Sequence, residues 1–178
     1  MKRLAILAMT VLFSLIAFIT NAQKKDVKQV KSQMTDQPYK VGATNVSIGN
    51  SALAQKVLWA WKYYDDNTLD KGPDLLADDV VASFPDGSVV KGKDNFMKAV
   101  KDYRNSLASA NSTVDACVTL KSPDMKDVEV VSIWGEETDT AKDGTVTKTH
   151  LNEVWFFNKE GKVVEFHQMA AKENPESK

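Results

Sequence analysis

Glu153 is the strongest candidate for a chemical role in this sequence, because aromatic residues are close to it. Trp155 lies two positions further along the same expected strand, and therefore on the same face. A carboxyl group between aromatic rings is desolvated, which raises its pKa and lets it donate a hydrogen bond at neutral pH. The alternative is that Glu153 lies at the sheet surface, in water or paired with a lysine.

The expected turn at Asp143-Gly144 gives Glu153 its first cross-strand neighbours. Asp-Gly is typical of a two-residue hairpin turn. Such a turn would place Trp134 opposite Glu153 and Ser132 opposite Trp155. The strand that precedes the turn would then add an indole and a hydroxyl group to the face that carries the acid.

A second turn, at residues 158–161, is expected to contain four residues and gives the other neighbours. It would place Phe166 opposite Glu153 and Gln168 opposite Leu151. We therefore predict one pocket face, to which more distant aromatic residues contribute. The predicted pocket residues are Trp61, Tyr64, Phe84, Ser132, Trp134, Glu153, Trp155, Phe157, Phe166 and Gln168.

The two histidines are second-rank candidates for proton transfer. The same register places His167 opposite Asn152 on the reverse face, beside His150. A single bulge in either strand would turn these side chains inward. Zinc needs three or four ligands, and two histidines with the single Cys117 do not provide them at motif spacing. We therefore expect no metal site and no cofactor.

The elements that must position these residues follow from periodicity and turn signals. Helices are expected at residues 51–67, 73–77 and 94–107, and strands at 80–84, 88–91, 114–120, 128–137, 145–157 and 162–171. Helices separated from a run of antiparallel strands indicate an α+β fold. Long hairpin strands predict a strongly curved antiparallel sheet wrapped around three helices, with a conical cavity between them.

The N-terminus resembles an export signal. Lys2 and Arg3 precede an apolar run over residues 4–19, and Ala22 suits a cleavage site. We predict a signal peptide at 1–22, a flexible linker at 23–48, one domain at 49–172 and a polar tail at 173–178. The protein would be exported to the periplasm or secreted, and the alternative is an uncleaved N-terminal membrane anchor.

Composition and charge exclude several classes of protein. With 43% hydrophobic residues and only 8 Gly and 5 Pro among 178 residues, the chain is neither disordered throughout nor collagen-like, and one cysteine cannot form an internal disulfide. Loss of Lys2 and Arg3 with the signal peptide would change the net charge from −1 to −3 and leave Arg104 as the only arginine. We therefore expect neither nucleic-acid binding nor, after cleavage, membrane binding.

Three motifs and the order of elements resemble the nuclear transport factor 2-like superfamily, which includes SnoaL-type polyketide cyclases, ketosteroid isomerases and scytalone dehydratases. The motifs are residues 76–80 leading into 84–87, the helix entry at 92–96, and the strand–turn–strand segment at 153–165. The resemblance spans about residues 50–171 and implies a cone-shaped fold. It also implies a homodimer, because family members commonly pair through the outer face of the sheet.

The resemblance further implies which catalytic positions are kept. Phe84 is where the isomerases hold the aspartate that acts as base, and Ala60 is where they hold an oxyanion-hole tyrosine. Only Glu153, in the place of a second pocket acid, keeps suitable chemistry. We therefore expect a non-catalytic domain that binds a small apolar or aromatic molecule. The alternatives are a cofactor-independent isomerase, cyclase or dehydratase that uses Glu153 or His167, and a dimeric interaction module.

Overall fold

The computed structural model describes residues 38–172. The predicted signal peptide, the predicted tail and the predicted linker up to residue 37 lie outside this range. The elements are β1 (Ser47–Ile48), α2 (Ser51–Asp65), the 3-10 helix η1 (Leu69–Lys71), β2 (Leu76–Ser83), β3 (Val89–Lys91), α3 (Lys93–Ser106), β4 (Leu107–Lys121), β5 (Glu129–Ala141), β6 (Val146–Phe157) and β7 (Val163–Lys172). No helix in this part of the chain is long and apolar enough to cross a membrane.

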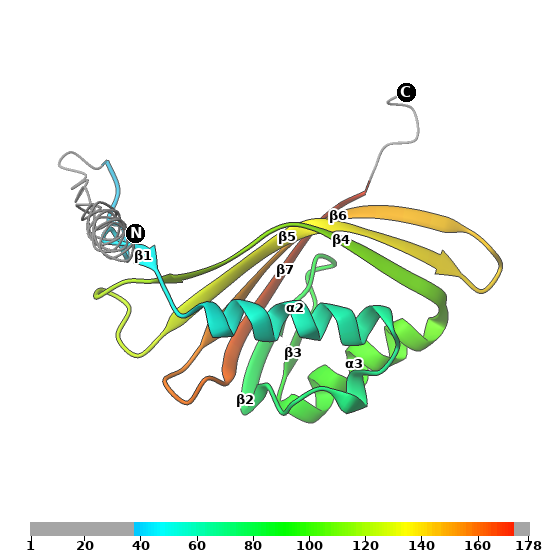
Figure 1. Cartoon of the computed structure of the whole chain (residues 1–178), viewed down its shortest axis with the longest axis horizontal. Helices are drawn as coiled ribbons and strands as arrows, with labels where there is room; N and C mark the ends of the chain where they lie inside the picture. Colours follow the sequence, from blue (N-terminus) through cyan, green and yellow to red (C-terminus); the bar gives the residue numbers. More distant parts are fainter. Residues whose placement is uncertain (1–37, 173–178) are drawn as a thin grey trace, which may run out of the picture. The chain divides into compact units, whose positions relative to one another are not determined.

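The strands form one seven-stranded sheet in the order β1-β4-β5-β6-β7-β2-β3. Neighbouring strands are antiparallel except β2 and β7, which pair in parallel. The sheet is therefore mixed, and the prediction of a wholly antiparallel sheet was wrong. The long strands β4, β5 and β6 arch over α2 and α3, as Figure 1 shows. The predicted α+β fold is confirmed.

Helix α2 begins where its sequence predicts and packs against β4 and β5. Asn50 caps it, because its side chain accepts a hydrogen bond from the backbone N–H of Ala52 at 3.0 Å. Leu53, Val57 and Trp61 recur at spacings of four residues and are the buried residues of the helix. This stripe directs Trp61 toward the interior of the molecule.

Residues 38–172 contain two α-helices, where three helices were expected. The expected helix at residues 73–77 is absent from the described chain: the 3-10 helix η1 precedes this segment, and β2 begins within it. Leu75 and Leu76 are both buried, and the backbone N–H of Val163 donates to the carbonyl of Leu75 at 2.9 Å. Pairing with β7 therefore overrides the helical signal of Pro73.

Two strand boundaries also differ from the prediction. Ser47 and Ile48, assigned to the linker, pair with Lys121 and Leu120 as strand β1. Strand β4 begins at Leu107 rather than at residue 114, because most of the residues before 114 already pair with β5. The folded domain therefore begins before residue 49.

The core lies between the helices and the sheet face they cover. Helix α3 contributes Phe96 and packs against β2, β3 and β4. The buried apolar residues of the core include Leu53, Val57, Trp61, Leu76, Val80, Ala82, Phe96, Val131, Ile133, Leu151, Trp155, Phe157, Val163 and Phe166.

Candidate functional site

The β5–β6 hairpin decides which side of β5 faces the helices. Its turn has three residues instead of two, because the backbone N–H of Ala141 donates to the carbonyl of Thr145 at 2.8 Å and Gly144 has a φ of 88°. A type I turn followed by a left-handed glycine is the usual three-residue loop. The extra residue places Ile133, and not Trp134, opposite Glu153.

This shift corrects two of the predicted pocket residues. Moving the register by one residue turns every side chain of a strand to the other face. Ser132 pairs with Val154, and Trp134 pairs with Asn152. Both therefore lie on the outer face of the sheet, where Trp134 is 39% exposed.

The β6–β7 hairpin differs from its prediction by an even number of residues, so the predicted face survives. Glu153 pairs with Gln168 and Trp155 with Phe166, where Phe166 had been expected opposite Glu153. A shift of two residues changes the partners but not the side of the sheet. The shared inner face of Glu153, Trp155, Phe166 and Gln168 is confirmed.

Glu153 is a buried carboxyl group that three N–H donors surround. The indole N–H of Trp61 donates to Oε2 at 2.6 Å, and that of Trp155 donates to the same oxygen at 3.0 Å. The side-chain amide of Gln168 donates to Oε1 at 2.8 Å. Side chains from α2, β6 and β7 therefore converge on one acid that has no cationic partner among these contacts.

The donors constrain where Glu153 can hold a proton. Burial raises the pKa of Glu153, while the hydrogen bonds from Trp61, Gln168 and Trp155 oppose this by stabilising the ionised form. An indole N–H can only donate, so Oε2 must accept in both protonation states. A proton can therefore reside only on Oε1, where the Gln168 amide would have to turn its oxygen toward the acid.

Aromatic rings form the apolar wall beside this acid. The rings of Trp155 and Phe166 meet edge to face with centroids 4.7 Å apart. Phe84 lies 5.8 Å from Phe166 and 6.0 Å from Phe96 by the same measure. Such packing holds the rings in fixed positions and makes this wall apolar.

These groups line a cavity of about 550 Å³ between the helices and the sheet. The predicted pocket residues that line it are Trp61, Tyr64, Phe84, Glu153, Trp155, Phe166 and Gln168. Phe157 is fully buried in the core and does not line the cavity. The size and the mainly apolar lining are typical of small-molecule sites.

The sequence analysis missed a second polar group, formed by Glu137 and Asp139 of β5, which reaches the cavity through Glu137. Glu137 lines the cavity, and Asp139 is 8% exposed. The hydroxyl group of Tyr103 on α3 donates to Asp139 Oδ2 at 3.0 Å. Burial raises the pKa of Glu137 to about 8, and the negative charge of Asp139 adds to the shift. The pKa of Asp139 is also raised, again mainly by burial.

The error in the β5–β6 turn explains this omission. With the predicted register, odd-numbered residues of β5 faced outward, and Glu137 was hidden among exposed acids. The signal that could have revealed the correct register is apolar: Val131 and Ile133 alternate along β5, and both are fully buried. Continuing their alternation leads to Gly135, Glu137 and Asp139.

Gly135 has a structural role beside Glu137 on the inner face of β5. A β-carbon there would collide with the carbonyl oxygen of Thr113 on β4. The close approach coincides with a bulge in β4 between Val114 and Ala116. Any side chain at this position would force the two strands apart next to the cavity wall.

The second-rank candidates lie outside the cavity. His167 pairs with Val154 instead of Asn152, and its Nε2 lies 2.7 Å from Glu165 on the outer face. Asn152 lies on the same face, and His150 is exposed and pairs with Glu136. The bulge in this hairpin, between Phe156 and Phe157, adds to a turn that is one residue shorter than predicted, so the register moves by two residues and the histidines stay on the outer face.

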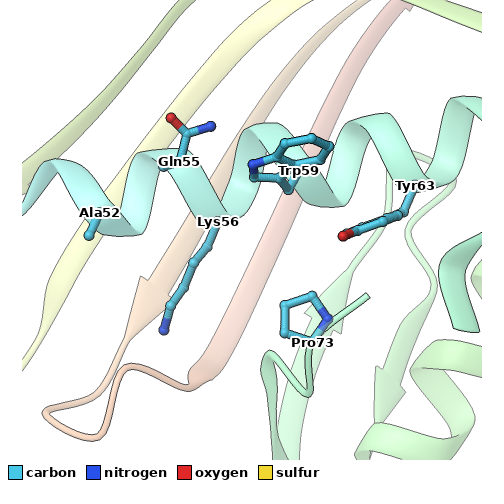
Figure 2. Close-up of a pocket in the computed structure, with 6 residues that line it drawn as sticks. All are labelled: Ala52, Gln55, Lys56, Trp59, Tyr63 and Pro73. Carbon is cyan, nitrogen blue, oxygen red and sulfur yellow. The ribbon is translucent and has the colours of Figure 1, made fainter. Parts of the chain in front are cut away.

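A smaller hollow of about 240 Å³ lies on the exposed side of α2. Figure 2 shows Trp59 and Tyr63 on the helix above Pro73, with Lys56 pointing away from the two rings. Lys56, Tyr63 and Pro73 also line the large cavity, so the two hollows adjoin. The small hollow has no acid, and its cation is engaged with the carbonyl oxygen of Gly161 at 3.2 Å.

The described residues include no group of three or more His, Cys, Asp or Glu side chains arranged to hold a metal ion. Cys117 is half-buried, and burial raises the pKa of its thiol to about 11. Its sulfur lies 3.6 Å from the carbonyl oxygen of Ala54. Cys117 therefore contacts the helix as a packing residue with little thiolate character.

Comparison with solved structures identifies the fold of this chain. No family model matches the sequence, and no curated protein matches it. A protein of unknown function from Burkholderia pseudomallei, described as NTF2-like, matches at TM-score 0.55 and 21% identity over 68% of this chain and 92% of that one. TerC, co-crystallized with polyporic acid, matches at TM-score 0.53 and 13% identity over 67% and 91%. IdmH, a putative polyketide cyclase from Streptomyces antibioticus, matches at TM-score 0.50 and 12% identity over 66% and 91%.

The chain has the nuclear transport factor 2-like fold. Within this fold, the three positions that the resemblance compares all line the cavity. Phe84 and Ala60 place apolar groups there, and Glu153 places a carboxyl group. The nuclear transport factor 2-like cavity of this chain therefore keeps an acid in an aromatic wall and lacks an ionisable group at residue 84.

Proposed function

We propose that the domain binds a small apolar or aromatic molecule in the 550 Å³ cavity, without catalysing a reaction. The observation that carries this proposal is a hollow with a mainly apolar wall that retains one highly organised acid. Glu153 Oε1 and the Gln168 amide are the polar groups available to orient a ligand, because Oε2 already accepts two indole N–H groups. The co-crystal of TerC with polyporic acid supports this use of the fold.

Phe84 supports the absence of catalytic turnover. The corresponding residue would be the base in the isomerases that the sequence resembles, and a phenyl ring accepts no proton. Phe84 packs against Phe96 and Phe166, so apolar rings stand on the side of the cavity where the isomerases would have the carboxylate. A ligand would therefore meet an apolar surface on this side.

A cavity-filling variant tests the binding proposal. We expect 2-naphthol to bind the described domain in calorimetric titration, and Val100→Trp, which fills part of the cavity, to weaken binding by about tenfold or more. Val89→Trp is the matched control, because Val89 is 56% exposed on β3 and does not line the cavity. Equal effects of the two variants, or no binding by the wild-type protein, would contradict the proposal.

The second candidate is a cofactor-independent isomerase, cyclase or dehydratase. It is favoured by one observation: Glu153 and Glu137 face the same cavity, and burial raises the pKa of both. His167 does not enter this scheme, because it lies on the outer face. Deuterium exchange of the α-protons of 2-tetralone, followed by NMR, tests it. Exchange above the buffer rate that Glu153→Gln abolishes would support catalysis and contradict the non-catalytic proposal.

We also propose that the domain forms homodimers through the outer face of its sheet. Trp134 and Met169 are 39% and 49% exposed there, and both pair with Asn152 in the sheet register. Exposed apolar side chains in a row are typical of interfaces. Sedimentation should show a dimer that Trp134→Lys dissociates, and a monomeric wild-type protein at high concentration would overturn the proposal.

Export remains a proposal based on residues 1–22. Intact-mass measurement of secreted protein should give a chain that begins after Ala22. Retention of residues 1–22 in membrane fractions would favour the anchored alternative.

A further inference from the structure

The carboxyl pair of Glu137 and Asp139 has a buried oxygen without a hydrogen-bond donor. Asp139 Oδ2 accepts from Tyr103, but Oδ1 is buried and receives no N–H or O–H group from the described residues. The carboxyl group of Glu137 is within hydrogen-bonding reach of Asp139. Two carboxylates cannot bond to each other, so the pair can form a hydrogen bond only when one of the two acids carries a proton.

The surrounding charges do not replace that proton. Asp65 of α2 lies close enough to raise the pKa values of both acids, and it accepts hydrogen bonds from the backbone N–H and hydroxyl group of Ser112. Arg104 is the buried cation beside them. Its Nε and Nη2 donate to the carbonyl oxygens of Tyr64 and Asp65 at 2.8 Å each, and not to a carboxylate. The pair is therefore a concentrated negative site, open to the cavity through Glu137.

We propose that Glu137 and Asp139 bind the protonated amine of an otherwise apolar ligand, whose ammonium group replaces the proton held between the two acids. This inference rests on the proposed function, because it specifies the class of molecule that the cavity takes. An ammonium group offers up to three donors, so it can satisfy Asp139 Oδ1 and Glu137 together. The apolar part of the ligand then lies along Val100, Phe84 and Trp155, toward Glu153.

The exchange of a proton for an ammonium group makes binding depend on pH. The titratable and charged groups that face the pair are Tyr64 and Asp65 of α2, Tyr103 and Arg104 of α3, Glu153 of β6 and, at the exposed end of β7, Lys172. Because burial raises the pKa of Glu137 to about 8, the pair is protonated below that pH. Binding of an amine should therefore release a proton and strengthen as the pH rises toward 8.

Two probes with the same ring test the inference: tryptamine, which is cationic, and tryptophol, in which a hydroxyl group replaces the amine. Calorimetric titration near neutral pH should show tryptamine binding about tenfold more tightly. Titration in buffers of different ionisation enthalpy should show release of up to about one proton per tryptamine. Glu137→Gln should remove both the preference and the proton release.

Glu136→Gln is the matched control, because Glu136 directly precedes Glu137 on β5 and lies on the opposite face. Its carboxylate forms a salt bridge with Lys148 at 2.9 Å. It should behave as the wild-type protein. Equal affinity for the two probes, or a tryptamine preference that persists in Glu137→Gln, would overturn the amine site and leave the cavity proposal standing. Binding of neither probe would overturn the amine site, and failure of 2-naphthol to bind as well would overturn the cavity proposal.

Discussion

The two acidic regions of the cavity share a strand pairing but differ in their partners. Glu137 pairs with Thr149, four residues before Glu153 on β6, so the two acids are separated by about 13 Å along the sheet. Burial raises the pKa of each. Glu153 receives three N–H donors, whereas the Glu137–Asp139 pair receives a single hydroxyl group from Tyr103.

This difference indicates how each acid responds to its surroundings. A buried acceptor whose hydrogen bonds are complete contributes to stability and resists change. A buried pair in which one oxygen has no donor is sensitive to any proton or cation that supplies one. We therefore expect substitutions of Glu153 and its three donors to affect folding stability. Substitutions of Glu137 should affect the pH dependence of stability and the choice of ligand.

Glu153→Leu should have the largest effect on stability. The indole N–H groups of Trp61 and Trp155 would stay buried without an acceptor, at a cost of about 3 kcal/mol in the free energy of unfolding. Glu153→Gln keeps an oxygen for both indoles and should cost about 1 kcal/mol. Urea unfolding followed by circular dichroism measures both. Equal losses would show that the acceptor oxygen does not stabilise this region.

Trp61→Phe should cost about 2 kcal/mol, because it removes one donor to a buried acid and some packing volume. It should also raise the pKa of Glu153 further, since one of the bonds that favours the ionised form is lost. Trp59→Phe on the same helix is the control and should cost less than about 0.5 kcal/mol, because Trp59 is 51% exposed. A similar loss in the two variants would contradict the role of the indole N–H.

Glu137 should give stability a pH dependence of opposite sign to that of a salt-bridged acid. Its pKa is raised from an ordinary 4.5 to about 8, so the folded state holds a proton that the unfolded state has released. Its contribution is fully present below about pH 4.5 and is lost as the pH rises through about 8. Glu137→Gln should flatten the fall in unfolding midpoint over this range. An unchanged pH profile would show that Glu137 is ionised in the folded protein at neutral pH.

His167→Ala should have the smallest effect, within about 0.5 kcal/mol, because its contact with Glu165 is an exposed pair. It should leave 2-naphthol affinity unchanged. Gln168→Ala, one residue further on β7 but on the inner face, should weaken binding, because it removes the amide that donates to Glu153. A loss of affinity on replacing His167 would place the ligand outside the cavity described here.

The sequence was sufficient to predict an element or a face where a pattern of residues repeats locally. The spacing of Leu53, Val57 and Trp61 located α2, and alternation along β6 and β7 placed Glu153 on the inner face. The pairing of β2 with β7 was not predictable in this way, because a short apolar strand carries no information about a partner that lies far away in the chain. The helix expected at residues 73–77 was wrong for the same reason.

The face of β5 depended on one turn. Asp-Gly suits a two-residue turn, and it equally suits the last two positions of a three-residue turn, which the structure adopts. The β6–β7 turn has the same three-residue form, with Gly161 at a φ of 71°. That turn is one residue shorter than predicted, and a bulge between Phe156 and Phe157 adds a second residue, so the total shift is two and the face stays correct. In β5 the shift is a single residue, and it exchanged Ile133 and Glu137 for Ser132 and Trp134.

The length of the loop at residues 142–144 therefore sets the phase of an entire strand. Removing one of its residues would slide β5 by a single position against β6 and direct an indole and a hydroxyl group inward, while two acids and a glycine moved to the outside. An exposed turn outside the cavity thus helps to determine which side chains line the interior. Redesign of the cavity could begin at that surface loop as well as in the interior.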